Sequence, residues 1–116
     1  MILAPGTKLE AVLAGAVSTN QPEVHVEYID YANTNEPTIP AFFRTALNST
    51  TDVTILAAPV NNPSREVLRI SVYNKDTTTA TPIIKTDDGT ERIVIRKTLA
   101  TLESLHWEKG VGWYVV

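Results

Sequence analysis

Several residue types are scarce in this sequence of 116 residues, and each scarcity excludes a class of protein. There is no cysteine, so a disulfide scaffold, a zinc–cysteine cluster and a thiol nucleophile are all excluded. Only two histidines, His25 and His106, are available for acid–base catalysis. Charged residues make up 20% of the chain and hydrophobic residues 43%, a balance too apolar for a disordered protein. We therefore expect a folded domain that is held together by packing alone.

Positive charge is scarce in the first 40 residues, although the net charge of the whole chain is only -3. This part has one basic residue, Lys8, against five acidic ones: Glu10, Glu23, Glu27, Asp30 and Glu36. A protein that binds a nucleic-acid duplex needs a positive surface to displace counterions from the phosphates. Nucleic acid is therefore not an expected partner.

Long hydrophobic runs are also missing. The apolar residues 1–4 are followed at once by Pro5, Gly6, Lys8 and Glu10, and no positive leader precedes them. A signal peptide requires a continuous apolar region of roughly 7 to 15 residues. We expect neither a signal peptide nor a membrane span.

What the chain has in abundance is β-branched residues: 37 of the 116 are Thr, Val or Ile. Such side chains are stiff and pack well on a pleated surface. Seven or eight short segments rich in them are separated by clusters of Asn, Asp, Gly, Pro and Thr. This spacing predicts one all-β domain over residues 1–116, an antiparallel β-sandwich of jelly-roll-like or Ig-like type. A small closed barrel is the alternative.

Alternation of apolar and polar residues predicts which face of each strand is buried. The clearest segment is 22–28, whose apolar positions are Val24, Val26 and Tyr28. Segment 8–14 alternates in the same way, which favours a strand over a helical turn.

The segment 65–73 has one apolar face, predicted to comprise Leu68, Ile70 and Val72. Its second face is mixed, with Val67, Arg69, Ser71 and Tyr73, as expected of a strand that a neighbour or a partner covers.

A hairpin is predicted over residues 81–98, because Asp88-Gly89 between apolar segments is a strong turn signal. Its return strand is expected to point Ile93 and Ile95 inward and Arg92 and Arg96 outward. Two more strands are predicted at 102–108 and 112–116.

Two parts of the chain lack such a pattern. Residues 30–50 are predicted to form a long irregular connection, since Pro37 and Pro40 disfavour a central strand; the alternative is one helical turn that starts at Pro40 and places Phe43 and Leu47 on one face. Residues 1–7 are interpreted as an extended arm that pairs with a sheet edge of another subunit, because their apolar start has no obvious place in the core. A frayed terminus is the alternative.

Few side chains in this sequence favour catalysis or metal binding. Glu23, His25 and Glu27 share the polar face of one strand, as a weak divalent metal site would require, but a solvated strand face is the favoured interpretation. His106 is expected at a surface or an interface. We expect no catalytic, metal-ligating or cofactor-binding residue, and no enzyme.

The aromatic residues allow a second interpretation. Trp107, Trp113 and Tyr114 are candidates for a platform on which a sugar ring stacks, whereas at least one tryptophan is expected in the core.

Four blocks of the sequence, taken in their order along the chain, resemble small β-rich structural proteins of tailed-bacteriophage virions. The blocks are Lys8–Val17, Asn48–Pro59, Arg69–Asp76 and Leu99–Trp113. The region 31–47 departs from that pattern, with Phe42-Phe43-Arg44 in place of a more Gly-rich loop.

The resemblance implies a non-enzymatic virion component without a cofactor. The favoured role is a capsid decoration, or cement, protein that binds the outside of the phage head and stabilises the shell; the alternative is a tail or head-fibre accessory module that binds a host-surface glycan or receptor. The implied partners are the major capsid protein, or a tail or fibre protein, and further copies of the chain in a homo-oligomer, expected to be a trimer. No membrane partner is expected. The implied location is the outer surface of the head, or the tail, after synthesis in the host cytoplasm. The candidate interface residues are Met1, Ile2, Leu3, Val67, Arg69 and Tyr73.

Overall fold

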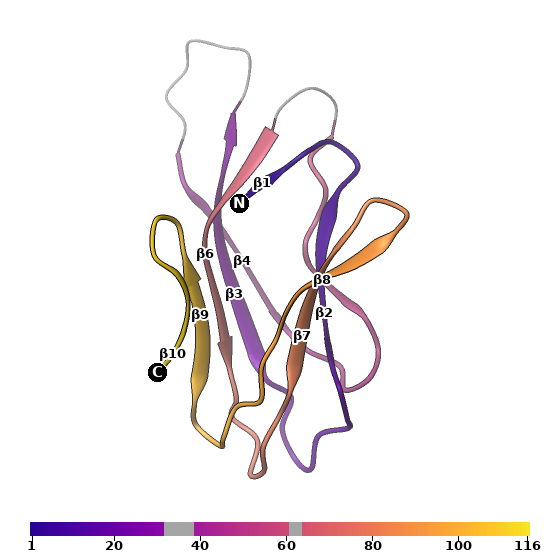
Figure 1. The fold of residues 1–116 in the computed structure, drawn as a ribbon, viewed down its shortest axis with the longest axis vertical. Helices are drawn as coiled ribbons and strands as arrows, with labels where there is room; N and C mark the ends of the chain where they lie inside the picture. The colour runs from indigo at the N-terminus through magenta and orange to yellow at the C-terminus, as the bar shows by residue number, and fades with distance from the viewer. Residues whose placement is uncertain (32–38, 61–63) are drawn as a thin grey trace.

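The computed structural model describes residues 1–31, 39–60 and 64–116, and these residues form two antiparallel sheets that face each other (Figure 1). The predicted all-β sandwich is confirmed, and the sheets do not close into a barrel. The described strands are β1 (Ile2–Leu3), β2 (Lys8–Leu13), β3 (Glu23–Tyr31), β4 (Ala41–Ala46), β5 (Val53–Leu56), β6 (Ser64–Tyr73), β7 (Pro82–Asp87), β8 (Glu91–Arg96), β9 (Ser104–Glu108) and β10 (Gly112–Val115).

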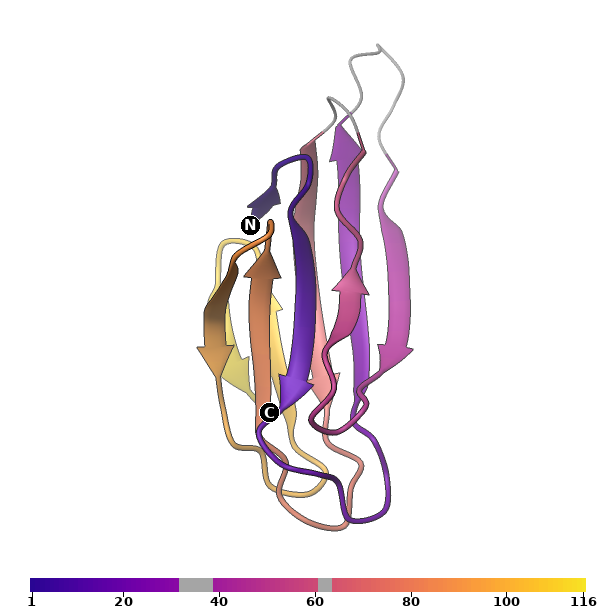
Figure 2. The ribbon, with the colours of Figure 1, turned by 90° about the vertical axis from the view of Figure 1, so that its right-hand side faces the viewer.

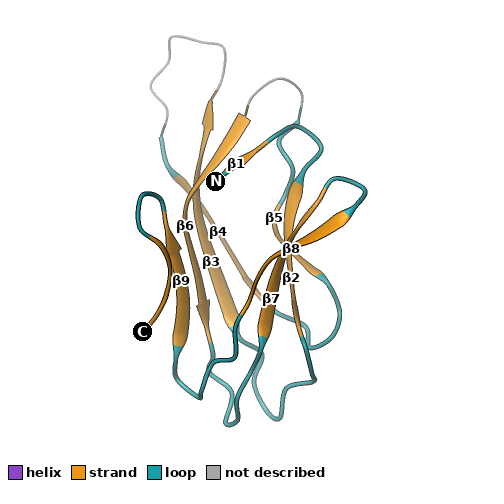
Figure 3. Cartoon of the chain, in the orientation of Figure 1, coloured by secondary structure: helices purple, strands orange, loops and turns teal. Residues whose placement is uncertain are grey.

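The larger sheet has the strand order β10-β9-β6-β3-β4, with β1 paired to the remaining part of β6. The smaller sheet has the order β5-β2-β7-β8. Figure 2 shows the two layers from the side of the smaller sheet, and Figure 3 shows that strands and loops make up the described chain. In the described part of the chain, no helix is long and apolar enough to cross a membrane.

The core lies between the sheets and consists of aliphatic side chains. The larger sheet contributes Val24, Val26, Ile70, Val72 and Leu105, and the smaller sheet contributes Leu9, Ala11, Ile55 and Ile84. The alternation predicted for segments 8–14 and 22–28 is therefore confirmed. These strands form because every second side chain is apolar and packs against the opposite sheet.

A β-bulge changes the faces of β6. Tyr28 of β3 lies opposite Val67, but its neighbour Glu27 lies opposite Arg69, so Leu68 is an extra residue. The bulge reverses the alternation at this point. Val67 is consequently fully buried in the core, and its predicted place on the partner-facing side is wrong. Only Arg69, Ser71 and Tyr73 are left on the second face.

A second bulge lies in the predicted hairpin, which is otherwise confirmed as β7 and β8. Ile84 pairs with Ile95 and Lys85 pairs with Ile93, so Val94 is the extra residue. Ile95 packs against the core as expected. Ile93 is 65% exposed, and its predicted inward orientation is wrong because the bulge turns it to the outer face.

The first residues of the chain belong to the chain's own sandwich. Ile2 lies opposite Glu66, Leu3 lies opposite Arg65, and the Val67 N–H donates to the Met1 carbonyl at 2.8 Å. Leu3 is 1% exposed and is part of the core. The expectation that this segment has no place in the core is therefore wrong, because a gap beside β6 accepts it.

The region 30–50 is more regular than predicted. Residues 32–38 lie outside the described residues, but 41–46 form β4, which pairs with β3. No helical turn forms over the described residues that follow Pro40. Phe43 lies opposite the core residue Val26 and is 41% exposed, and Leu47 is buried, so strand pairing and not a helical turn places these two side chains.

Asp76 fixes the loop between β2 and β3. Its buried carboxylate accepts four backbone hydrogen bonds, from Ser18 (2.8 Å), Thr19 (2.8 Å), Asn20 (3.0 Å) and Thr77 (2.9 Å). The Ser18 N–H and the other three donors hold the pKa of Asp76 well below its usual range, against the opposing effect of burial. One ionised side chain therefore holds together two loops that are distant in sequence.

Candidate functional site

The outer face of the larger sheet brings together side chains from five strands. The strand registers align Arg44, His25, Ser71, His106 and Tyr114 in one row across β4, β3, β6, β9 and β10. Directly opposite residues in antiparallel strands have Cβ atoms roughly 4.5 to 5.5 Å apart. The two histidines of the chain thus lie on either side of Ser71.

This row crosses a shallow hollow of about 360 Å³, which we call the outer trough. Its wall combines aromatic rings, two guanidinium groups, carboxylates and hydroxyls. The lining residues are Glu23, His25, Glu27, Phe42, Arg44, Arg69, Ser71, Tyr73 and His106.

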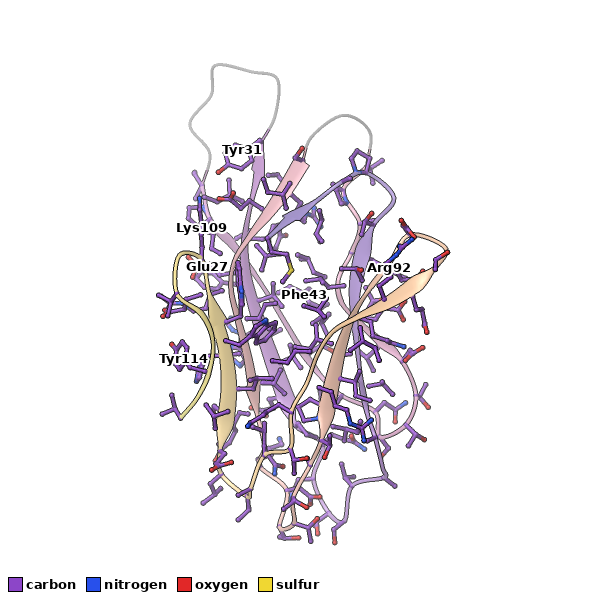
Figure 4. All side chains as sticks on the ribbon, viewed as in Figure 1. Glu27, Tyr31, Phe43, Arg92, Lys109 and Tyr114 are labelled. Carbon is purple, nitrogen blue, oxygen red and sulfur yellow. The ribbon has the colours of Figure 1, made fainter. Side chains whose placement is uncertain are left out.

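Side-chain contacts fix both ends of the row that runs from Arg44 to Tyr114. At one end, Arg44 Nε donates to His25 Nδ1 at 3.2 Å, and the Arg44 guanidinium lies 5.5 Å from the centroid of the Phe42 ring. At the other end, the His106 ring stacks on Tyr114 with centroids 5.2 Å apart and an interplanar angle of 17°. These contacts fix the orientation of the Phe42, His25, His106 and Tyr114 rings. Figure 4 shows Tyr114 on the side of the larger sheet that is turned away from the smaller one.

Ion pairs neutralise part of the charge in the outer trough. Glu23 Oε1 lies 2.7 Å from Lys75 Nζ, and the ammonium lowers the pKa of Glu23. Glu108 holds two partners, because its Oε1 lies 2.9 Å from Arg69 Nη2 and its Oε2 accepts a hydrogen bond from the Tyr114 hydroxyl at 3.0 Å. Desolvation, followed by this bond to Glu108, raises the pKa of Tyr114.

Two charged groups of the outer trough keep no ion pair among the described residues. These are Arg44, at the β4 edge, and Glu27, on β3. A cation and an anion that line the same partly apolar hollow suit a partner that has polar groups of both signs.

Ser71 and its two neighbouring imidazoles do not form a nucleophilic site in this geometry. A serine nucleophile needs a base within hydrogen-bond reach, and the base needs an orienting acid. Among the described residues, no hydrogen bond joins the Ser71 hydroxyl to His25 or His106, and the His25 Nδ1 instead accepts from Arg44. The row instead consists of hydrogen-bonding groups and aromatic rings.

The structure separates the residues that the sequence grouped as a candidate interface. Arg69 and Tyr73 line the outer trough, and Ile2 is 64% exposed. Leu3 and Val67 are core residues, and Met1 packs against the core. Sequence reasoning missed Phe42 and Arg44 as trough residues, since their place depends on the pairing of β4 with β3.

Glu23, His25 and Glu27, which the sequence allows as a weak metal site but favours as a solvated strand face, share one face of β3 as predicted. However, Glu23 is bound to Lys75 and His25 to Arg44. Within the described residues, the set whose ligand atoms come close enough to hold an ion is a different one, Glu10, Asp87 and Glu91.

The candidate glycan platform is not assembled. Trp107 and Trp113 lie with ring centroids 6.4 Å apart and pack against the core, which bears out the prediction of a core tryptophan. Tyr114 is one residue further along β10, so its side chain points to the opposite face, where it stacks on His106.

Comparison of the chain with family models, with curated proteins and with solved structures finds no match.

Proposed function

We propose that the protein is a non-enzymatic virion structural protein, a capsid decoration or cement protein that binds the outside of a tailed-bacteriophage head and stabilises the shell. The observation that carries the proposal is the outer trough, a broad sheet face with exposed rings and guanidinium groups. The order of the four sequence blocks supplies the virion context.

The composition of the outer trough supports binding to another protein. Aromatic residues and arginine are enriched in protein interfaces and supply most of their binding energy. Phe42 is 58% exposed although it is large and apolar, and Arg44 lies against its ring. Covering Phe42 with a partner removes this apolar area from water.

Many copies of a small protein on a symmetrical shell reinforce it even when each interface is modest. The outer trough lies on one face of the sandwich, so a subunit bound through it presents the smaller sheet away from its partner. The arm of residues 1–7, expected from the sequence to pair with another subunit, has no part in this mechanism, because β1 is paired with β6 and Leu3 is buried.

We expect Phe42→Ala to weaken attachment to shells by about 30-fold or more, because truncating an anchor side chain in an interface removes roughly 2 kcal/mol or more. The measurement is co-sedimentation of the purified protein with preformed shells that lack it. Ile93→Ala is the matched control, since Ile93 is similarly exposed (65%) but lies on the smaller sheet. Equal attachment of the two variants would remove the outer trough from the mechanism. Electron microscopy of decorated particles then locates the bound protein.

The second candidate function is a tail or fibre module that binds a glycan. It is favoured by the half-buried rings of Tyr73 and His106 in the outer trough and by the stacking of His106 on Tyr114. Binding to a panel of surface polysaccharides should then be lost in Tyr73→Ala. Because Trp107 and Trp113 lie on the other face, tryptophan fluorescence is a poor reporter of this event. Absence of binding across the panel by the folded wild-type protein would reject this candidate.

A further inference from the structure

The outer edge of β4 is a long and regular strand edge that no other described strand pairs with. The strand orders end at β10 and β4 in the larger sheet and at β5 and β8 in the smaller one, and Figure 2 shows β4, in magenta, at one margin of the sandwich. Exposed edges are commonly protected by bulges or by being short. β5 and β8 each contain a bulge, and β5 and β10 have only four residues. β4 has six residues and an uninterrupted register with β3, so it has neither form of protection.

β4 exposes a phenylalanine on each of its faces. Phe42 lies opposite Glu27, on the side of the outer trough, and is 58% exposed. Phe43 lies opposite the core residue Val26, yet it is 41% exposed, because the smaller sheet does not fully cover β4. Figure 4 shows Phe43 on the side of the smaller sheet and Glu27 on the opposite side. A partner that rests on the outer trough covers Phe42 alone, whereas a strand added alongside β4 contacts both rings.

We propose that β4 pairs with β4 of a second copy of the chain, antiparallel and about a two-fold axis that passes beside Phe43. Two-fold symmetry is the commonest symmetry of homo-oligomers. In this register Phe43 lies opposite Phe43 of the second copy, and Phe42 lies opposite Arg44 of the second copy. The two larger sheets become one continuous sheet, and both outer troughs lie on the same side of it and stay open.

The residues of β4 select this register among those that two-fold symmetry allows. Directly opposite residues share a face, so the axis passes beside a residue and not between two. An axis beside Arg44 would set the two Arg44 side chains opposite each other, and like charges in this position are destabilising. An axis beside Phe42 would set Arg44 opposite Pro40, which has no N–H to donate. The axis beside Phe43 avoids both faults.

Charge complementarity supports the same register. Arg44 and Glu27 have no ion pair among the described residues. Because Glu27 lies opposite Phe42, it lies two strands away from Arg44 of the second copy and on the same face. Two strand spacings are roughly 10 Å, a distance that an arginine and a glutamate side chain span together. The two-fold axis forms this contact twice.

The first test is sedimentation of the full chain over an about 100-fold range of concentration. We expect the average mass to rise toward that of two chains as the concentration increases. Phe43→Lys should remain a single chain, because the two ammonium groups would meet at the axis. Ile93→Lys is the matched control, since it adds the same charge to an exposed apolar residue (65%) on the edge strand β8, and it should associate as the wild type does.

The second test reverses the charges one at a time. Arg44→Glu sets carboxylates against Glu27 of the second copy, and Glu27→Arg sets guanidinium groups against Arg44. Each variant alone should associate about tenfold more weakly than the wild type. An equimolar mixture of the two variants should recover the association, because opposite charges then meet at both contacts. An effect confined to one chain does not produce recovery on mixing.

A wild-type protein that stays a single chain over the whole range would overturn the proposal, as would a mixture that associates no better than its two components. A species of three chains, as the virion resemblance implies, or pairing that persists in folded Phe43→Lys, would assign association to another surface and reject β4. Circular dichroism checks that each variant retains its strands. None of these outcomes depends on whether the outer trough binds a shell, because the readout is the mass of the free protein and Phe43 does not line the outer trough.

Discussion

Replacing Leu3 with alanine is expected to lower the free energy of unfolding by about 2 to 5 kcal/mol, the range found for buried leucines. Leu3 is 1% exposed and belongs to the core, although it is the third residue of the chain. Because domains are stable by only about 5 to 15 kcal/mol, this loss is a large part of the total. Denaturation in urea, monitored by circular dichroism, measures it.

The neighbouring Ile2 provides the control. It lies in the same strand but is 64% exposed, so Ile2→Ala should change stability by about 0.5 kcal/mol or less. Equal stabilities for Leu3→Ala and Ile2→Ala would mean that β1 does not dock on β6 in solution. Deletion of residues 1–5 should destabilise at least as much as Leu3→Ala, since it also removes the bond between the Val67 N–H and the Met1 carbonyl.

Replacing Asp76 is expected to cause the largest loss among polar substitutions. In Asp76→Ala the N–H groups of Ser18, Thr19 and Asn20 lose their acceptor, and unsatisfied donors of this kind are costly. We expect the melting temperature to fall by on the order of 10 °C. Asp88→Ala, in an exposed turn, should leave it nearly unchanged.

The contribution of Asp76 should also depend on pH. Its pKa is lower in the folded than in the unfolded protein, so ionised Asp76 stabilises the fold above the unfolded value of roughly 3.9. This stabilisation is lost progressively as the pH falls below that value toward the folded pKa. The difference in melting temperature between wild type and Asp76→Asn should therefore shrink between pH 5 and pH 2. A difference that is independent of pH would show that geometry, and not charge, accounts for the role of Asp76.

The sequence predicts the parts of the fold that depend on local alternation. Val24 and Val26, and likewise Leu9 and Ala11, are each separated by one polar or outward residue, and the structure buries all four. The Asp88-Gly89 turn is equally local, since Gly89 adopts a positive φ of 105°.

Features that depend on the register between paired strands could not be predicted from the sequence. The bulges at Leu68 and Val94 are set by the partner strand, and each reverses the faces that alternation assigns to Val67 and Ile93. The insertion of Leu3 into the core needs the part of β6 that β9 leaves unpaired.

The candidate-site residues divide in the same way, into those that local alternation places and those that strand pairing places. His25 was assigned to the correct face of its strand from alternation alone. Its alignment with Ser71 and His106 requires the registers of β3, β6 and β9, which no local pattern contains. The role of Asp76 was missed, because three of its four backbone donors lie 56 to 58 residues earlier.

The central position of β6 also bears on how the protein is made. During synthesis, Ile2, Leu3 and the whole of β3 leave the ribosome well before residues 64–73, their partners in the larger sheet. Until then a nascent chain can close only the β3–β4 hairpin of that sheet. Folding dominated by such distant pairings is slow, and unpaired strand edges invite association with other chains. The nascent protein therefore passes through a stage in which its aggregation hazard is highest, and mutations that delay the docking of β6 should reduce soluble yield more than they reduce the stability of the finished fold.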